Sequence, residues 1–480
     1  FQNFYISKFL NSVIGVLSLS AFYKKINFME EIMSQKTTKL FLILASMILA
    51  LSCSSPFGDE GTGGGSDGGG GSGGGTQVID GKEFPSWYLT EQQQQQNFSM
   101  GPTILFASTK NPMQHYRIPA IIVASNGNII AISDNRYNHG GDIGAVKGLI
   151  DVVYKVSKDG GYTWSDEKIM GDKSTSHDYD KALNKGDALV FRANDGDLVC
   201  MAVSGGGFAN ATDTTPSRML RSESKDNGET WSNWEEVGQD LINSIKNKWK
   251  NPKAFAPAGR GLTLKDGTFA AAMIGATDSG GLYGLYIYST DKGKTWKRSD
   301  NFIASTGGHG QWNEPKVIAE LNNGKLLMSV RNGMSRAGKN DPRMYAVSLD
   351  VPVNGNCNWP SSLLAWQPIR CGGVDAEGVV WTRANEQDKD RMLHIQAGPN
   401  GRQSLKLFLS TDEGINWTVA KVILGDETPA AYSSLDVCGD GTIITLAEEG
   451  TKAGVHYDIV FRRYNMKAIT GEVYKTSWYK

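Results

Sequence analysis

Two short segments of the sequence carry residues that could do chemistry. One could bind a carboxylate, and the other could donate a proton to a bound ligand. Arg117 stands directly before Ile118-Pro119, and this proline and the apolar run that follows it hold the arginine in one place. A guanidinium fixed in this way can form two parallel hydrogen bonds with a carboxylate. Asp142 follows in a glycine-flanked loop. If such a loop closes over a ligand, loss of water raises the pKa of its carboxyl group and favours proton donation.

One motif, Ser-x-Asp-x-Gly-x-Thr/Asn-Trp, recurs four times and indicates the elements that position these residues. The copies begin at Ser157, Ser224, Ser289 and Ser410. In each copy the aspartate can accept hydrogen bonds from the N–H groups of a tight turn. The glycine supplies a backbone conformation that other residues resist, and the tryptophan packs the turn into apolar surroundings. The motif therefore predicts a series of similar β-hairpins.

The spacing of the motif predicts an all-β fold, a six-bladed β-propeller. The first three copies recur after 65 to 67 residues, and the last follows after 121 residues, which is close to two blades. A degenerate turn marks the expected missing copy, with Ser348, Asp350, Gly355 and Trp359. The region after Asn97 then divides into about six blades.

An ordered set of motifs resembles the bacterial exo-α-sialidases (neuraminidases), in which this repeated turn is called the Asp-box. The set runs through most of the chain after residue 100, and its members are Tyr116-Arg117-Ile118-Pro119, the Asp-boxes, Asn313-Glu314, Arg331 at the end of a strand, Arg402 and Tyr432-Ser433. The Asp-box alone is a turn that lectins also contain. The resemblance therefore depends on the whole order of motifs.

The resemblance implies three arginines that clamp the carboxylate on the anomeric carbon of sialic acid. Arg117 matches the first place, Arg331 the second and Arg402 the third. Arg336 remains an alternative for the second place, and Arg391 for the third.

The resemblance also implies roles for three residues between the first two of these arginines. Asp142 matches the acid/base catalyst, and Arg136 matches a secondary arginine near the substrate carboxylate. Asp187 matches an aspartate that faces the polar substituents of the sugar, although Ala188 follows it where the family has proline. Asp178 remains an alternative for this place, as does Asp180.

Glu314 and Tyr432 match the residues that carry the central chemical step. Most retaining glycosidases use a carboxylate nucleophile, and sialidases with a tyrosine are an exception. A carboxylate would be repelled by the carboxylate on the carbon that it attacks. A neutral phenol is not repelled, and a neighbouring glutamate can accept its proton. Trp312, beside this glutamate, is expected to line a sugar site.

The resemblance implies a retaining exo-α-sialidase that removes terminal sialic acid from glycoproteins, glycolipids and oligosaccharides. One alternative is a non-catalytic lectin or adhesin that binds sialic acid with the arginines alone. A second alternative is a trans-sialidase that transfers the sugar to another acceptor. The charge is nearly balanced, with 49 basic and 50 acidic residues, which argues against nucleic acid as a partner. No cysteine or histidine spacing indicates a metal site, and no cofactor is expected.

The sequence before the predicted propeller divides into three segments. Residues 1–32 read as an over-extended reading frame, and residues 33–53 as a lipoprotein-type signal peptide, with a charged start, an apolar run and Cys53 as the lipidated residue. Residues 54–97 read as a flexible linker, rich in glycine and serine and then in glutamine. Residues 98–480 form the predicted catalytic propeller. We therefore expect an exported protein, anchored by lipid at the outer membrane or cell surface, or else periplasmic or secreted.

The remaining cysteines divide into two pairs. Cys357 and Cys371 flank a loop and could form a disulfide outside the cytoplasm. Cys200 and Cys438 lie in apolar strands and are expected to be buried thiols.

Overall fold

The structure is a computed structural model. It describes residues 75–79, 81–110, 113–176, 184–247, 253–278, 281–301, 303–304, 312–332, 340–452 and 456–476. The chain divides into two compact units, 1–70 and 71–480, and the described residues all belong to the second unit. The predicted reading-frame extension and signal peptide, with Cys53, lie outside the described residues, as do Asp178, Asp180 and Arg336.

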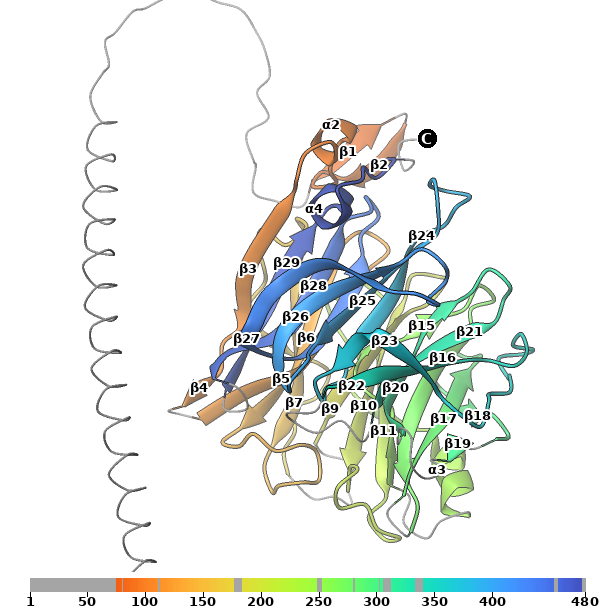
Figure 1. The fold of residues 1–480 in the computed structure, drawn as a ribbon. Coiled ribbons are helices and arrows are strands. Elements are labelled where there is room, and N and C mark those ends of the chain that lie inside the picture. Colours follow the sequence, from red (N-terminus) through yellow and green to blue (C-terminus); the bar gives the residue numbers. More distant parts are fainter. Residues whose placement is uncertain are drawn as a thin grey trace, which may run out of the picture. The chain divides into compact units, whose positions relative to one another are not determined.

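The second unit is an all-β propeller built mainly from antiparallel sheets (Figure 1). The first sheet consists of β4 (Thr109–Lys110), β5 (Met113–Val123), β6 (Ile129–Tyr137), β7 (Ile150–Ser157) and β8 (Lys168–Ile169). The second consists of β9 (Gly186–Arg192), β10 (Leu198–Gly205), β11 (Ser217–Ser224), β12 (Glu235–Val237) and β14 (Gly259–Arg260), which pairs parallel to β9.

Two further sheets follow in chain order. The third consists of β13 (Lys253–Phe255), β15 (Leu262–Thr263), β16 (Phe269–Ala276), β17 (Leu282–Ser289), β18 (Lys297–Arg298) and β19 (Ile303–Ala304). The fourth consists of β20 (Trp312–Glu320), β21 (Leu326–Asn332), β22 (Asp341–Val347) and β23 (Leu364–Cys371).

A seven-stranded sheet completes the propeller and joins its two ends. It consists of β24 (Glu377–Thr382), β25 (Arg391–Ala397), β26 (Gln403–Ser410), β27 (Thr418–Val437), β28 (Ile443–Lys452), β29 (His456–Tyr464) and β3 (Ser99–Phe106). Its edge strand β3 comes from the start of the propeller and pairs antiparallel with β29, beside which Figure 1 draws it. Strands from the two ends of this unit thus share one sheet.

The apolar core lies between successive sheets. Central strands such as β10 and β16 are buried along their whole length, because each sheet is covered on both faces by its neighbours. Their sequences are therefore nearly continuous apolar runs instead of alternating ones. One cluster joins the second sheet to the third, and contains Phe191 and Phe269, whose stacked rings lie 4.5 Å apart.

The Asp-box turns have the predicted hydrogen bonds. In the first copy the Ser157 hydroxyl donates to Asp159 at 2.8 Å, and the Thr163 N–H donates to the same carboxylate at 2.9 Å. The Trp164 indole N–H donates to the Gly161 carbonyl at 3.2 Å. The degenerate copy keeps the central contact, since the Asn358 N–H donates to Asp350 at 2.7 Å.

The linker prediction for residues 54–97 is wrong for its last part. Residues 76–94 form β1 (Thr76–Ile79), β2 (Lys82–Pro85) and the helix α2 (Glu91–Gln94). The glutamine run begins a helix because Thr90 and Gln93 form a reciprocal capping box. The Gln94 amide is buried and donates to the Asp440 carbonyl at 2.8 Å, which attaches this segment to the propeller.

Two short helices and the cysteines complete the description. The helices are α3 (Gln239–Lys246) and α4 (Met466–Thr470).

Cys357 and Cys371 are free thiols, so they do not form a disulfide. Cys357 packs with Trp359 in one apolar cluster, whereas Cys371 ends β23, where it pairs with Asp341. Cys200 and Cys438 are buried free thiols, as predicted. Within the described ranges, every helix is too short or too polar to cross a bilayer.

Candidate active site

A cavity of about 280 Å³ lies where strands of all the large sheets converge. Its charged and polar lining brings together six of the residues that the sequence singled out. These are Asp142, Asp187, Glu314, Arg331, Arg402 and Tyr432. They come from segments that are far apart in the chain, which is possible because the strands of a propeller end around a common axis.

Glu314 and Tyr432 are in direct contact in this cavity. The Tyr432 hydroxyl donates to Glu314 Oε1 at 2.6 Å, and Arg331 Nη1 donates to Glu314 Oε2 at 2.5 Å. The same Arg331 nitrogen lies 3.2 Å from the Tyr432 hydroxyl oxygen. The three side chains therefore form a closed triangle of hydrogen bonds that ties an acceptor for the phenol proton to the phenol.

The environment keeps the Tyr432 phenol neutral in the absence of ligand. Burial and the Glu314 carboxylate raise the pKa of Tyr432 well above its usual value, against the lowering effect of Arg331 and Arg402. A phenolate would therefore form only together with proton transfer to Glu314. A phenol and a carboxylate at this separation are suited to concerted proton removal and attack.

The backbone is strained at three of the lining residues. Ile118, Asp187 and Glu314 have φ angles of 59°, 55° and 31°, in a region that side chains other than glycine rarely adopt. Each such residue costs about 1–3 kcal/mol, and such residues concentrate at functional sites. Glu314 lies where the pairing of β20 with β21 shifts register between Asn313 and Pro315, so a bulge turns its side chain toward the cavity.

Two of the three predicted arginines lie over the ring of Tyr432. The guanidinium carbons of Arg117 and Arg402 each lie 5.6 Å from the centre of that ring. Arg331 contacts its hydroxyl, so the three arginines surround one side chain. Arg391, the alternative for the third place, instead bonds Asp388 and Glu472.

Glu448 is a site residue that the sequence reasoning missed. Its fully buried carboxylate accepts from Arg117 Nε at 2.6 Å and from the Ile118 N–H at 2.8 Å. The other oxygen accepts from the Tyr432 N–H at 3.2 Å. Glu448 thus fixes the first arginine and the backbone of the tyrosine together. The signal that could have revealed it is a glutamate directly after the mainly apolar run 443–447 in the same strand.

Asp142 lies on an exposed loop and is held by Arg136. Arg136 Nη1 donates to the Asp142 carboxylate at 2.6 Å and to the Gly140 carbonyl at 3.2 Å. The surrounding protein partly desolvates the carboxyl group and tends to raise the pKa of Asp142, but Arg136 and then Arg117 outweigh this effect and hold the pKa below its usual value. The predicted rise of this pKa concerns the loop closed over a ligand, and it stays a prediction.

His139 supports the same loop. Its Nδ1 accepts from the Gly141 N–H at 3.2 Å, and its Nε2 lies 3.2 Å from the Leu149 carbonyl. Both contacts are satisfied together by the neutral ring with its proton on Nε2. The ring lies against Gly148, where a Cβ would come within 2.1 Å of it.

Asp187 and Asp134 form a second carboxylate pair beside the arginines. Asp134, which the sequence reasoning also missed, is buried, accepts from Arg136 Nη2 at 2.9 Å and accepts from the Asp187 N–H at 2.9 Å. Burial and the neighbouring Asp134 and Asp142 carboxylates raise the pKa of Asp187 well above its usual value. A protonated Asp187 could donate a hydrogen bond to a ligand in the cavity.

The apolar part of the cavity lining, here called the apolar wall, consists of Ile118, Ile143, Ala145, Val203, Phe208, Ala209, Phe255, Ile274 and Leu282. The rings of Phe208 and Phe255 meet edge to face, 5.6 Å apart. Trp312 begins β20, and the position of its side chain lies outside what the structure describes, so its expected role in a sugar site remains a prediction.

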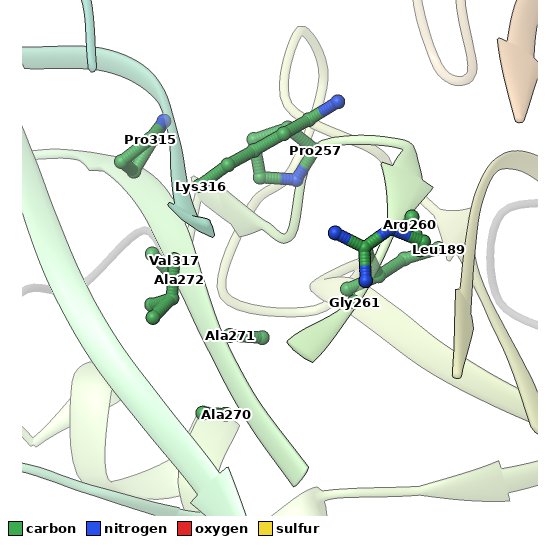
Figure 2. A pocket seen from close by; sticks show the side chains of 10 residues that line it. All are labelled: Leu189, Pro257, Arg260, Gly261, Ala270, Ala271, Ala272, Pro315, Lys316 and Val317. Atoms are coloured by element: carbon green, nitrogen blue, oxygen red, sulfur yellow. The ribbon is translucent and has the colours of Figure 1, made fainter. Parts of the chain in front are cut away.

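A second, much smaller cavity lies close to β20. It has a volume of about 10 Å³, which is room for about one water molecule. Figure 2 shows its lining, in which the charged side chains of Lys316 and Arg260 stand among small and apolar residues. This cavity is too small for a substrate. It nevertheless lies close to the site, because its lining residue Lys316 follows Glu314 by two positions in β20.

Comparison with known proteins identifies the family. Residues 144–445 match the BNR repeat-like domain. The chain belongs to the BNR repeat-like domain family. The resemblance to bacterial sialidases that the motifs predicted is confirmed, because the curated relatives of this family member carry that name.

Three bacterial sialidases illustrate the similarity in sequence. The sialidase of Clostridium perfringens is 30% identical over 243 residues, which cover 48% of this chain and 59% of that protein. The sialidase of Micromonospora viridifaciens is 26% identical over 362 residues, or 72% of this chain and 51% of that protein. The sialidase of Bacteroides fragilis is 26% identical over 356 residues, or 69% and 60%. The chain thus spans between 51% and 60% of the length of these relatives.

Solved structures share the fold at lower identity. The Hadza microbial sialidase Hz136 has a TM-score of 0.60 at 21% identity, covering 77% of this chain and 69% of that one. The Trypanosoma rangeli sialidase has a TM-score of 0.58 at 20% identity, covering 76% and 59%. A leech intramolecular trans-sialidase has a TM-score of 0.58 at 16% identity, covering 78% and 71%.

Proposed function

We propose that the protein is a retaining exo-α-sialidase that hydrolyses terminal sialic acids of glycoproteins, glycolipids and oligosaccharides through a covalent tyrosyl intermediate. The observation that carries this proposal is the 2.6 Å hydrogen bond between Tyr432 and Glu314. Arg331 and Arg402 line the same cavity, and Arg117 lies over the Tyr432 ring. Arginines alone would serve a lectin. A buried phenol paired with a carboxylate is the arrangement that a nucleophile requires.

Substrate binding would begin with the carboxylate of sialic acid at the three arginines. Arg117, Arg331 and Arg402 present planar donors around the Tyr432 ring, and their charges match one carboxylate. This places the anomeric carbon, which bears that carboxylate, next to the phenol oxygen. Asp187 and the apolar wall face the remainder of the sugar ring.

Each half of the reaction would then involve two proton transfers. Glu314 Oε1 takes the proton of the Tyr432 hydroxyl as the oxygen attacks the anomeric carbon. Asp142 gives a proton to the glycosidic oxygen as its bond to that carbon breaks. In the second half, Asp142 takes a proton from water, the water oxygen attacks the same carbon, and the proton returns from Glu314 to the departing phenolate. The configuration is inverted twice and therefore retained.

The Asp142 carboxyl would gain its proton only when substrate binds. In the free protein Arg136 and Arg117 hold its pKa low. A bound carboxylate neutralises the arginines, and the sugar removes water from the loop. Both changes raise the pKa of Asp142 toward a value suited to proton donation.

Two finer features of the prediction belong to the same proposal. We count six blades if the seven-stranded sheet is divided within the long strand β27, and apolar clusters then lie between successive blades.

We also propose that the protein is exported and anchored through a lipid on Cys53, which metabolic labelling with a fatty acid would test.

The proposed activity is tested by release of 4-methylumbelliferone from its α-sialoside. We expect hydrolysis by the purified protein and none by Glu314→Gln. Free sialic acid as product indicates hydrolysis, whereas an anhydro sugar or a new sialoside would indicate transfer. Absence of any sialic acid release, with binding retained, would leave the lectin alternative.

A further inference from the structure

Buried acidic side chains contact the two strands that carry Glu314 and Tyr432. Lys316 follows Glu314 by two positions on β20, and Ser434 follows Tyr432 by two positions on β27. The first contacts Asp375, at 2.8 Å between Lys316 Nζ and Asp375 Oδ2. The second contacts Glu377, since the Ser434 hydroxyl donates to Glu377 Oε2.

Asp375 lies two positions before Glu377, which is the first residue of β24. One short segment, residues 375–377, therefore contacts both the strand of Glu314 and the strand of Tyr432. We call Asp375 and Glu377 the paired anchor.

The paired anchor is buried and fixed from other directions. Relative exposures are 2% for Asp375, 1% for Glu377, 5% for Lys316 and 0% for Ser434. Glu377 Oε1 also accepts from the Arg260 N–H at 2.8 Å. Buried charges that are fully bonded allow little movement, because any displacement leaves a charge without its partner.

Arg343 fixes the segment that carries the paired anchor, residues 375–377. It lies 3.6 Å from Asp375 Oδ1, and its Nη2 donates to the Ala376 carbonyl at 3.4 Å. Its Nε donates to the Ser329 hydroxyl at 2.6 Å, and Ser329 pairs with Lys316 across β20 and β21. Two sets of contacts therefore join segment 375–377 to the strand of Glu314. One is the Lys316–Asp375 ion pair, and the other runs through Arg343 and Ser329.

The space beside Lys316 also fits this arrangement. Figure 2 shows the extended side chain of Lys316 in the lining of the small cavity, which Arg260 also lines. A Cβ on Gly259 would lie 2.4 Å from Lys316 Nζ and 3.0 Å from Glu377 Oε2. The glycine therefore leaves room for the ammonium group and the carboxylate to approach the same point.

We propose that Asp375 and Glu377 are positioning residues that set the separation of the Glu314 carboxylate and the Tyr432 hydroxyl, Asp375 through Lys316 and Glu377 through Ser434. The inference rests on the proposed function, because this separation matters for proton transfer between the two groups. Within the described residues, neither Asp375 nor Glu377 forms an ion pair or hydrogen bond with Arg117, Arg331 or Arg402, so we expect ligand binding to depend on the anchor less than proton transfer does.

The test compares variants that change the length of the Glu377 side chain or its contact with Ser434. Ser434→Ala removes the hydroxyl that contacts Glu377, and Glu377→Asp shortens the side chain and keeps its charge. Glu377→Gln keeps the length and an acceptor for the Arg260 N–H, and its NH2 group can donate to the Ser434 hydroxyl oxygen instead of accepting from it. The measured quantities are the rate of covalent labelling by 2,3-difluorosialic acid, from intact-protein mass, and the dissociation constant for the inhibitor DANA. Asp440→Asn is the matched control, because Asp440 forms an equally buried ion pair with Arg463 that lies away from the cavity lining.

We expect Ser434→Ala and Glu377→Asp to label at least about tenfold more slowly, with DANA affinity within about threefold of wild type, because small displacements of reacting groups are costly. Glu377→Gln should label at nearly the wild-type rate. Wild-type labelling by Ser434→Ala, a slower Glu377→Gln than Glu377→Asp, or an equal loss in Asp440→Asn would overturn the proposal.

A failure of the proposed function would be recognised separately. If the wild-type protein is not labelled at all, the sialidase proposal fails, and the anchor is then judged by crystal structures alone. A Tyr432–Glu314 separation that is longer in Ser434→Ala than in wild type would support the anchor, and an unchanged separation would overturn it.

Discussion

Tyr432 and Glu314 share a 2.6 Å hydrogen bond although they are 118 positions apart in the chain and lie on β27 and β20. Neither side chain acquires this geometry from its local sequence. Glu314 reaches it through a bulge and a φ angle of 31°, and Arg331 bonds both groups. The contact therefore depends on closure of the propeller and on the buried charges that contact its two strands.

Removal of the phenol oxygen should abolish turnover. We expect Tyr432→Phe to lose several orders of magnitude in kcat with the α-sialoside, because no other neutral nucleophile contacts Glu314 among the described side chains. The Glu314–Arg331 ion pair remains, so the melting temperature should change little. Steady-state kinetics and thermal unfolding measure both effects. Wild-type activity in this variant would exclude Tyr432 as the nucleophile.

Loss of the Asp142 carboxyl should depend on the leaving group. Proton donation helps a basic leaving group much more than an acidic one. We therefore expect Asp142→Ala to lose far more activity on sialyllactose than on the 4-methylumbelliferyl sialoside. The ratio of kcat/KM for the two substrates measures this difference. An equal loss on both would indicate that Asp142 has a structural role in its loop.

Ligand binding should be accompanied by proton uptake. The pKa of Asp142 is below its usual value in the free protein. We expect it to rise when a ligand carboxylate pairs with the arginines. Between these two pKa values the complex binds more protons than the free protein, so affinity should weaken as pH rises through that window. Calorimetry of DANA binding in buffers of different ionisation enthalpy measures the uptake. Asp142→Asn should abolish it, and uptake that persists in this variant would assign the proton to another group.

The third arginine is tested by ligand-induced stabilisation. DANA should raise the melting temperature of the wild-type protein because it binds the native state. Arg402→Lys should lose most of this shift, since an ammonium group cannot reproduce two planar hydrogen bonds. Arg391→Lys is the control, because Arg391 bonds Asp388 and Glu472 instead of lining the cavity. A full shift in Arg402→Lys would show that the carboxylate binds elsewhere.

The sequence predicted those parts of the structure that depend on local hydrogen bonds or on ordered motifs. The Asp-box turns were predictable because each aspartate bonds N–H groups only four positions away. The positions of Arg117, Arg331 and Arg402 followed from their order along the chain. In contrast, Glu448, Asp375 and Glu377 act on partners in distant strands, and their carboxylates lie in otherwise apolar segments.

Two other features were not predicted from the sequence. The pKa of Asp142 depends on the distance to Arg136, which only the folded loop sets. The glutamine run was read as a linker from its composition, although Thr90 and Gln93 carried the signature of a helix start.

The identity of the nucleophile is the central claim, and one measurement tests it most directly. The protein would be incubated with 2,3-difluorosialic acid, digested at low pH, and its peptides sequenced by mass spectrometry. The account predicts one added sugar on the peptide that contains Tyr432, and none in Tyr432→Phe. A sugar attached to Glu314, to Asp142 or to any other residue, or turnover of the α-sialoside without any adduct, would contradict it.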